Sequence, residues 1–204
     1  MAKNSVELLD SFGRKLKGLE QTRKRQEILF SNSQIVLRDI EEVYAALFLG
    51  VVVSFEDLIE ELFIGMLAGK IYSKYSSVNV RVKIKSDKVA HEVVLQGRKF
   101  FDWLPYERTK KIANVFFAGG RPFTLITQDE EKHIDKCLII RHAIVHQSRH
   151  AIDKFRQEVL AGLSLTPRDK RPKRFLHAQF SANPPMNHYQ RLVGELFKIA
   201  SKLC

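Results

Sequence analysis

The stretch VYAALFLGVVVSFEDLIEELF, residues 43–63, decides the fold class of this chain. Its first part, Val43 to Val53, is the longest apolar run in the sequence, and it is too short to span a bilayer. Four acidic residues follow it directly at helical spacing: Glu56, Asp57, Glu60 and Glu61. We therefore expect a core helix rather than a membrane span, within one long central helix from Gln34 to about Tyr75.

The segments on either side carry the same helical periodicity, with few breakers inside them. Ser31-Asn32-Ser33 offers both a helix stop and N-cap chemistry ahead of the central helix. Further helices are expected over residues 4–30, from Pro105 to the pair Gly119-Gly120, from Thr127 or Asp129 through Val145, over 151–160 and over 186–203. The sequence thus predicts an all-α fold, an antiparallel helical bundle formed as a single domain over residues 1–204.

One segment departs from the helical pattern. Val78, Val80, Val82 and Ile84 alternate with polar residues, and a period of two residues is typical of a strand. We expect a small β-hairpin insertion over about residues 78–96, in which Val93-Val94-Leu95 forms the second strand.

The composition favours a folded, basic protein. The chain has 204 residues, 45% of them hydrophobic, with 34 Lys and Arg against 23 Asp and Glu, which gives a formal charge of +11. Such an excess attracts polyanions, so nucleic acid is the leading partner, against the alternative of a merely soluble basic surface. The distant cysteines Cys137 and Cys204 indicate neither a disulfide framework nor a zinc site, and the polar N-terminus lacks the apolar core of a secretory signal. We expect a cytoplasmic location and no membrane association.

A second stretch, IIRHAIVHQS at residues 139–148, carries the expected chemistry. It sets Arg141, His142 and His146 into an otherwise apolar helical segment. At about 100° per residue His142 and His146 share one face of the helix, whereas Arg141 and His146 diverge by about 140°. Two histidines that titrate near neutral pH, with a guanidinium for phosphate oxygens, are the minimum set for attack of a ribose 2′-hydroxyl on the adjacent phosphodiester. This chemistry needs no metal and no cofactor.

The spacing of these residues resembles a known family. Arg141, four intervening residues and His146, with a polar residue directly after the arginine, resemble the Arg-x4-6-His signature of HEPN-domain ribonucleases. Residues 54–63 (SFEDLIEELF), 103–109 (WLPYERT) and 116–123 (FFAGGRPF) are similar to RiboL-PSP-type HEPN proteins of prokaryotes. The resemblance spans about residues 40–150. It implies an all-α bundle that dimerises so that two motifs face each other and cut RNA without metal, often in toxin or antiphage settings. The family more often has Asn where this chain has His142.

From the resemblance and the chemistry together, we expect a homodimeric, metal-independent endoribonuclease. His146 removes the 2′-hydroxyl proton or protonates the leaving 5′-oxygen, and Arg141 stabilises the charged phosphorane. His142 orients the phosphate or supplies the second proton function. The alternative is a non-catalytic module that binds RNA or nucleotides through the same residues. A third interpretation is a helical scaffold in a toxin–antitoxin or defence assembly, with an antitoxin or defence protein as its partner.

A basic segment follows the motif, over about residues 164–185. We expect an exposed loop, because Pro167 and Pro172 disfavour a helix there. Its functional interpretation is an arm that binds phosphates, with Phe175 and His177 stacking on bases, and the alternative is a solvated connector. The predicted nucleic-acid-binding residues are Arg149, Arg168, Lys170, Arg171, Lys173 and Arg174.

Other candidate sites have weaker support in the sequence. The acidic residues at 56–61 lack the Glu-x-x-His partner that a di-metal bundle site needs, so structural ion pairing is the default, with Glu60 a candidate partner for Arg141. The isolated histidines His91, His133 and His188 fit surface or capping positions. No P-loop, dinucleotide fingerprint, GxSxG or HExxH pattern is present in the sequence.

Overall fold

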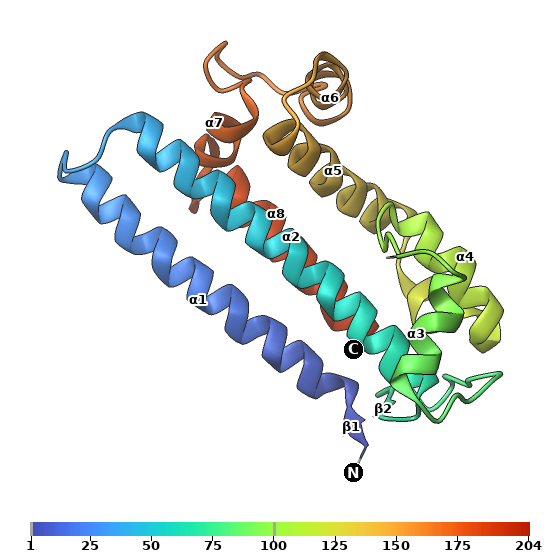
Figure 1. Ribbon diagram of the computed structural model, residues 1–204. Helices are drawn as coiled ribbons and strands as arrows, with labels where there is room; N and C mark the ends of the chain where they lie inside the picture. The colour runs from blue at the N-terminus through green and yellow to red at the C-terminus, as the bar shows by residue number, and fades with distance from the viewer. Residues whose placement is uncertain (1, 100) are drawn as a thin grey trace. The chain divides into compact units, whose positions relative to one another are not determined.

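The computed structural model describes residues 2–99 and 101–204 and confirms the all-α fold class (Figure 1). The described residues form eight α-helices: α1 Ser5–Ser31, α2 Leu37–Leu67, α3 Asp87–Leu95, α4 Tyr106–Phe116, α5 Gln128–Val145, α6 Arg149–Lys154, α7 Pro172–His177 and α8 His188–Leu203. Single turns of other helix types lie at η1 Ala118–Gly120, η2 Phe123–Leu125 and, in π form, η3 Phe155–Val159. Two short ladders complete the elements: parallel β1 Lys3–Asn4 with β2 Ile71–Tyr72, and antiparallel β3 Gln179–Ala182 with β4 Pro185–Asn187.

The contacts divide the chain into two compact units. The first, unit 1, holds residues 1–14, 54–135 and 197–204, and the second, unit 2, holds 15–53 and 136–196. Helices α1, α2, α5 and α8 contribute residues to both. In the part of the chain that the structure describes, no helix is at once long enough and apolar enough to cross a membrane.

Unit 1 is built around an aromatic cluster centred on Phe63. Its ring lies 4.9 to 6.1 Å, centroid to centroid, from four others: Trp103, Phe116, Phe117 and Phe123. The polar groups at this cluster are satisfied, because the Tyr106 hydroxyl donates to the Phe123 carbonyl (3.0 Å) and the Thr109 hydroxyl to the Trp103 carbonyl (2.7 Å). Burial of these large rings stabilises this unit.

Unit 2 has a polar network at its centre. Tyr44 is 0% exposed, and its hydroxyl donates to the Glu27 carboxylate while it accepts from Asn187 Nδ2 (2.6 Å) and Arg23 Nη1 (3.1 Å). Burial raises the pKa of Tyr44, and the bond to Glu27 adds to that rise. The neutral hydroxyl therefore joins α1, α2 and β4 at the centre of the unit.

The stretch at 43–63 is helical, as expected, and lies inside α2. Most of its apolar residues are buried, among them Leu47, Phe48, Val51 and Val52 in unit 2, and Phe55, Ile59, Leu62 and Phe63 in unit 1. The helix ends at Leu67, earlier than the predicted Tyr75. Gly69 takes a left-handed φ of 68°, and the amides of Gly69 and Lys70 donate back to the carbonyls of Met66 (3.1 Å) and Gly65 (2.8 Å). This Schellman pattern terminates the helix.

The predicted β-hairpin over 78–96 is wrong. Asp87–Leu95 is the helix α3, with Ser86 as its N-cap and with Ala90 and Val94 buried on one face. In the described part of this segment, Val80 makes only an isolated antiparallel bridge, to Phe117. Apolar residues four positions apart fit a helix face, and a short Val-rich run does not distinguish a strand from such a helix.

The predicted loop over 164–185 is also wrong in its second half. Pro172 occupies the first turn of α7, where its missing N–H is no loss and its fixed φ suits a helix. Strand β3 follows within the same segment and pairs with β4. Phe175 is only 3% exposed and packs against the rings of Phe155 and His188, so it is not available to stack on a base.

The predicted helix starts at Pro105 and Thr127 are confirmed. Pro105 is the N-cap of α4. Thr127 and Glu130 form a reciprocal capping box before α5, in which Glu130 N donates to Thr127 Oγ1 (3.3 Å) and Thr127 N to Glu130 Oε2 (2.9 Å). This capping fixes the start of the helix whose other end carries the Arg-His motif.

Candidate active site

A short break between α5 and α6 shapes the motif region. The His146 amide donates to the His142 carbonyl (2.9 Å) in the last turn of α5, and Gln147 then takes a left-handed φ of 45°. Ser148 caps α6 by accepting a hydrogen bond from the Ala151 amide (3.2 Å). The break lets side chains from the end of one helix and the start of the next face a common space.

That space is a pocket of about 190 Å³ inside unit 2. Three exposed histidines and one exposed lysine line it: His142, His146, His150 and Lys154. Ile139, Ser148 and Ala151 complete the lining. The rings of His142 and His146 lie 5.6 Å apart, centroid to centroid, at 69°, which confirms that these two residues share a face.

The electrostatics of this pocket, here called the histidine pocket, favour a neutral His142. Partial burial lowers the pKa of His142, and the positive charges of Arg141, His146 and Lys154 lower it further. Within the described part of the chain, Lys154 makes a single, long ion pair, to Glu158 at 3.8 Å. The pocket therefore combines an imidazole ready to accept a proton at neutral pH with a cation that can attract phosphate.

The structure brings together two of the three motif residues. Arg141 is half-buried and is not among the described residues that line the histidine pocket. Its position follows from helix geometry, since it points about 100° away from His142. Its charge nevertheless acts on His142 by lowering that pKa.

His150 and Lys154 are residues that the sequence reasoning missed. Both line the histidine pocket beside the two motif histidines. The signal was present, because His142, His146, His150 and Lys154 follow one another at intervals of four. Residues at this spacing lie on one face of a helix. Although the chain breaks after α5, the four side chains still line the same pocket.

The predicted nucleic-acid-binding residues fall into two groups. Three are engaged by acids of unit 2: Arg171 with Glu41 (3.4 Å), Lys173 with Glu42 (2.6 Å) and Arg174 with Asp169 (2.9 Å). The other three are exposed: Arg149, Arg168 and Lys170. Of these, Arg149 has one long ion pair, to Asp153 at 3.7 Å. The structure therefore offers a smaller free basic surface than the sequence suggests.

His177 does not form the predicted base-stacking surface. Its side chain is 15% exposed and packs against the rings of Phe30 and Tyr44. Nε2 lies 3.3 Å from Glu27 Oε1, and Nδ1 lies 2.9 Å from Arg174 Nη1. His177 is thus part of the interior of unit 2.

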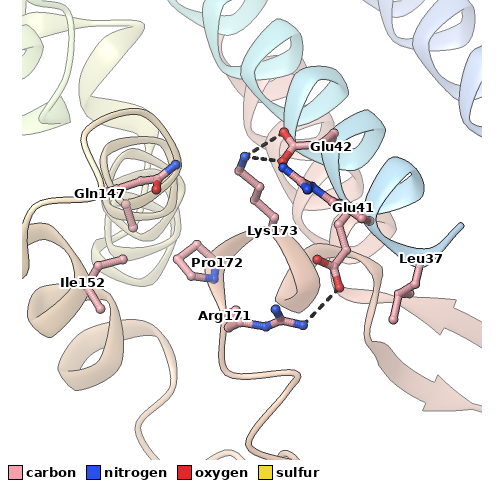
Figure 2. Close-up of a pocket in the computed structure, with 10 residues that line it drawn as sticks. Leu37, Glu41, Glu42, Gln147, Ile152, Arg171, Pro172 and Lys173 are labelled. Atoms are coloured by element: carbon pink, nitrogen blue, oxygen red, sulfur yellow. Dashed lines mark hydrogen bonds and ion pairs between the residues drawn. The ribbon is translucent and has the colours of Figure 1, made fainter.

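A second, larger cavity of about 620 Å³ lies on the other side of the α5 terminus, in the same unit. Figure 2 shows Gln147 and Ile152 on one side of it and the N-terminal turns of α2 on the other, with residues 171–173 between them. Its polar lining consists of Arg38, Glu41, Glu42, Gln147, Arg171 and Lys173. We call this cavity the α2–α7 cleft.

The remaining candidates have structural roles. Glu60 accepts a hydrogen bond from Trp103 Nε1 (2.8 Å) and lies 3.7 Å from His91 Nδ1. His188 is buried and stacks on Phe175. Both cysteines are free and buried. Among the residues of 2–99 and 101–204, no group of three or more His, Cys, Asp or Glu side chains is placed to hold a metal ion.

Comparison with protein-family models, with curated proteins and with solved structures found no match to this chain.

Proposed function

We propose that this chain is a metal-independent endoribonuclease of the HEPN type and that the histidine pocket is its active site. The observation that carries the proposal is the convergence of His142, His146 and His150 with Lys154 on one small, exposed pocket. Acid–base cleavage of a phosphodiester needs one base, one acid and a cation for the phosphate, and these imidazoles and the ammonium group supply all three. The formal charge of +11 supports RNA as the partner.

In the proposed reaction the ribose 2′-oxygen attacks the adjacent phosphorus, and the bond from phosphorus to the 5′-oxygen breaks. His142, held neutral by its lowered pKa, takes the proton from the 2′-hydroxyl. His146, in its protonated form, gives a proton to the leaving 5′-oxygen. Lys154 offsets the charge that builds on the phosphate oxygens. The products are a 2′,3′-cyclic phosphate and a 5′-hydroxyl.

Arg141 has a supporting role in this proposal. It does not line the pocket, yet its charge favours the neutral form of His142. In this proposal its guanidinium contacts a flanking phosphate, rather than the reacting one, when RNA is bound. Substitution of Arg141 should therefore weaken cleavage less than substitution of His146 does.

Cleavage of mixed RNA by the purified chain tests the proposal. Wild-type protein should cut RNA in the presence of EDTA and leave 2′,3′-cyclic phosphate ends, and His146→Ala should not. His133→Ala is the matched control, because His133 lies on the same helix outside the pocket. RNA that is bound in a salt-sensitive way but never cut would instead identify a binding module.

We also propose a toxin or antiphage role, which rests only on the resemblance of the sequence to HEPN ribonucleases. A partner antitoxin or defence protein belongs to the same proposal. Induced expression of the wild-type chain in a bacterial host should then arrest growth. Expression of His146→Ala to the same level should not, and equal arrest by both proteins would contradict this role.

A further inference from the structure

The α2–α7 cleft contains a carboxylate with unused hydrogen-bonding capacity. Glu41 is 9% exposed, and its one hydrogen bond among the described residues comes from Arg171, whose Nη2 donates to Oε1 at the long distance of 3.4 Å. Its charge also acts on His177: burial lowers the pKa of His177, and Glu41 acts in the opposite direction. An ionised carboxylate can accept about four hydrogen bonds. A largely buried carboxylate with so few hydrogen bonds at the wall of a cavity can accept further hydrogen bonds from a ligand that brings donors.

Its neighbour Glu42 shows the contrast. Both carboxylate oxygens of Glu42 accept from Lys173 Nζ, at 2.6 and 2.7 Å, and the side chain is 55% exposed. Figure 2 shows the two acids on the same side of the cleft, each with its own basic partner. Of these two acids, it is therefore Glu41 that has unused hydrogen-bonding capacity.

The cleft also contains guanidinium groups that can bind a ligand. Arg38 is exposed, and among the described residues no acid lies within ion-pairing distance of its guanidinium. The Arg171 side chain is 60% exposed; its Nη2 donates to Glu41 and its Nε to the Arg168 carbonyl (3.3 Å), so the donors of Nη1 remain available. Guanidinium groups bind phosphate oxygens in pairs, which gives the cleft a second chemical preference.

The rest of the lining is apolar. Leu37, Ala143, Ile152 and Pro172 supply this surface, which suits a flat, weakly hydrated ring. The volume of about 620 Å³ lies within the range of small-molecule sites. A ligand that matches all three parts has a planar ring, adjacent donors on its edge and a phosphate.

We propose that the α2–α7 cleft binds a guanine nucleotide, with the guanine edge on Glu41 and the phosphate on Arg38 and Arg171. The choice of base follows from donor geometry. The N1–H and the 2-amino group of guanine are adjacent donors, so they match the two oxygens of one carboxylate. Adenine and cytosine set a ring acceptor beside their amino group, and uracil sets its N–H between two carbonyls. Each of these would turn an acceptor toward the carboxylate.

Calorimetric titration of the full chain tests this site with three probes: guanosine, inosine and adenosine 5′-monophosphates. We expect the guanine nucleotide to bind, and the inosine nucleotide, which lacks the 2-amino group, to bind at least about tenfold more weakly because one charge-assisted hydrogen bond is lost. Adenosine monophosphate should bind more weakly still. Equal affinity for the guanine and adenine nucleotides, or no binding of any of them, would overturn the proposal.

Variants separate the base contact from the phosphate contact. Glu41→Gln should lower affinity for guanosine monophosphate at least about tenfold and remove its advantage over the inosine nucleotide. Glu92→Gln is the matched control, because Glu92 is exposed and is not among the described residues that line the cleft, and it should leave both affinities within about twofold. Arg38→Ala should weaken binding of guanosine monophosphate and leave binding of guanosine unchanged. The unfolding midpoint of each variant shows whether it is folded. If a variant does not fold, the nucleotide preference of the wild type still tests the proposal. Retained guanine preference in a folded Glu41→Gln protein would overturn the assignment.

The guanine could belong to a free nucleotide or to RNA, and two oligonucleotides distinguish these sources. They are 2′-O-methylated and differ only in one guanine or adenine, so neither can be cut by 2′-hydroxyl attack. A guanine oligonucleotide that competes with guanosine monophosphate and binds more tightly identifies RNA as the source. Failure to compete identifies a free nucleotide. Both results keep guanine recognition, and neither depends on whether the histidine pocket cleaves RNA.

Discussion

At the scale of single residues, His188 shows how burial sets a protonation state. It is 4% exposed, stacks on Phe175 with ring centroids 4.1 Å apart, and lies edge-on to Phe180. Burial first, and then the charge of Arg191, lowers its pKa to about 4, while Asp169 acts in the opposite direction. The neutral imidazole belongs to the folded state, and the charged form favours the unfolded chain.

This pKa makes a prediction about stability. Because the folded-state pKa is below the unfolded value, the contribution of His188 is fully present above about pH 6.5 and is lost as the pH falls toward 4. The loss should reach on the order of 2 kcal/mol by pH 5. Urea unfolding of wild type and His188→Phe at pH 7.5 and pH 5 measures it. The variant should lose less stability than the wild type, and equal losses would contradict the assignment.

His142 makes a second prediction, about the pH dependence of cleavage. A general base must be neutral, so the acid limb of kcat/KM should follow its lowered pKa. Lys154 is one of the charges that lower that pKa, and its removal in Lys154→Gln should shift the acid limb to higher pH. Rates will also fall because a phosphate contact is lost. A lower rate with an unshifted limb would show that Lys154 does not act on the base.

At the scale of elements, the long periodic helices were predictable and the short elements were not. The apolar periodicity of residues 43–63 predicts a helix there, and Thr127 with Glu130 indicates the start of α5. Helix α3 was mistaken for a strand because its few valines fit both periods. Helix α7 was missed because Pro172 was interpreted as a breaker, although the first turn of a helix accepts proline.

The same limit applied to the candidate site. Sequence reasoning found His142 and His146 through the motif, but it placed the next helix at 151–160, after His150, and did not identify that helix as a second wall of a pocket. The four-residue spacing to His150 was visible in the sequence. What was not visible is the break at Gln147, whose left-handed backbone is unusual for a residue other than glycine. The weakly engaged carboxylate of Glu41 also depends on tertiary packing, which no local pattern reveals.

Substitution of two glycines by alanine should change the stability of the chain in opposite directions. Gly69 ends α2 with a φ of 68°, and a Cβ there would meet nothing within 4 Å, so Gly69→Ala should cost about 1 kcal/mol through backbone strain alone. Gly18 lies inside α1, and a Cβ there also meets nothing within 4 Å. Gly18→Ala should therefore stabilise the chain by about 0.5–1 kcal/mol. Thermal unfolding of both variants measures the effects, and effects of the same sign would contradict the Schellman assignment.

At the scale of the whole molecule, the question is whether each chain carries a complete site. The histidine pocket lies within unit 2 of a single chain and has three histidines, enough for an acid and a base. The resemblance that we noted implies instead two motifs facing each other in a homodimer. We propose that a homodimer, if formed, holds two independent pockets rather than one shared cleft.

Mixing inactive variants distinguishes these arrangements. His142→Ala and His146→Ala proteins, unfolded together and refolded as a mixture, would restore cleavage if one site took His142 from one chain and His146 from the other. Independent pockets predict no recovery above the sum of the separate variants. A mixture of wild type and His146→Ala serves as the reference, because its activity should follow the amount of wild type alone.

The central claim is that the histidine pocket cleaves RNA through the ribose 2′-hydroxyl, and one substrate tests it most directly. This substrate is a DNA oligonucleotide with a single ribonucleotide, incubated in EDTA with wild type, His146→Ala and the control His133→Ala. We expect one cut, after the ribose, with a 2′,3′-cyclic phosphate end, made by the wild type and the control and abolished in His146→Ala. Cutting at deoxyribose positions, or equal cutting by His146→Ala, would contradict it.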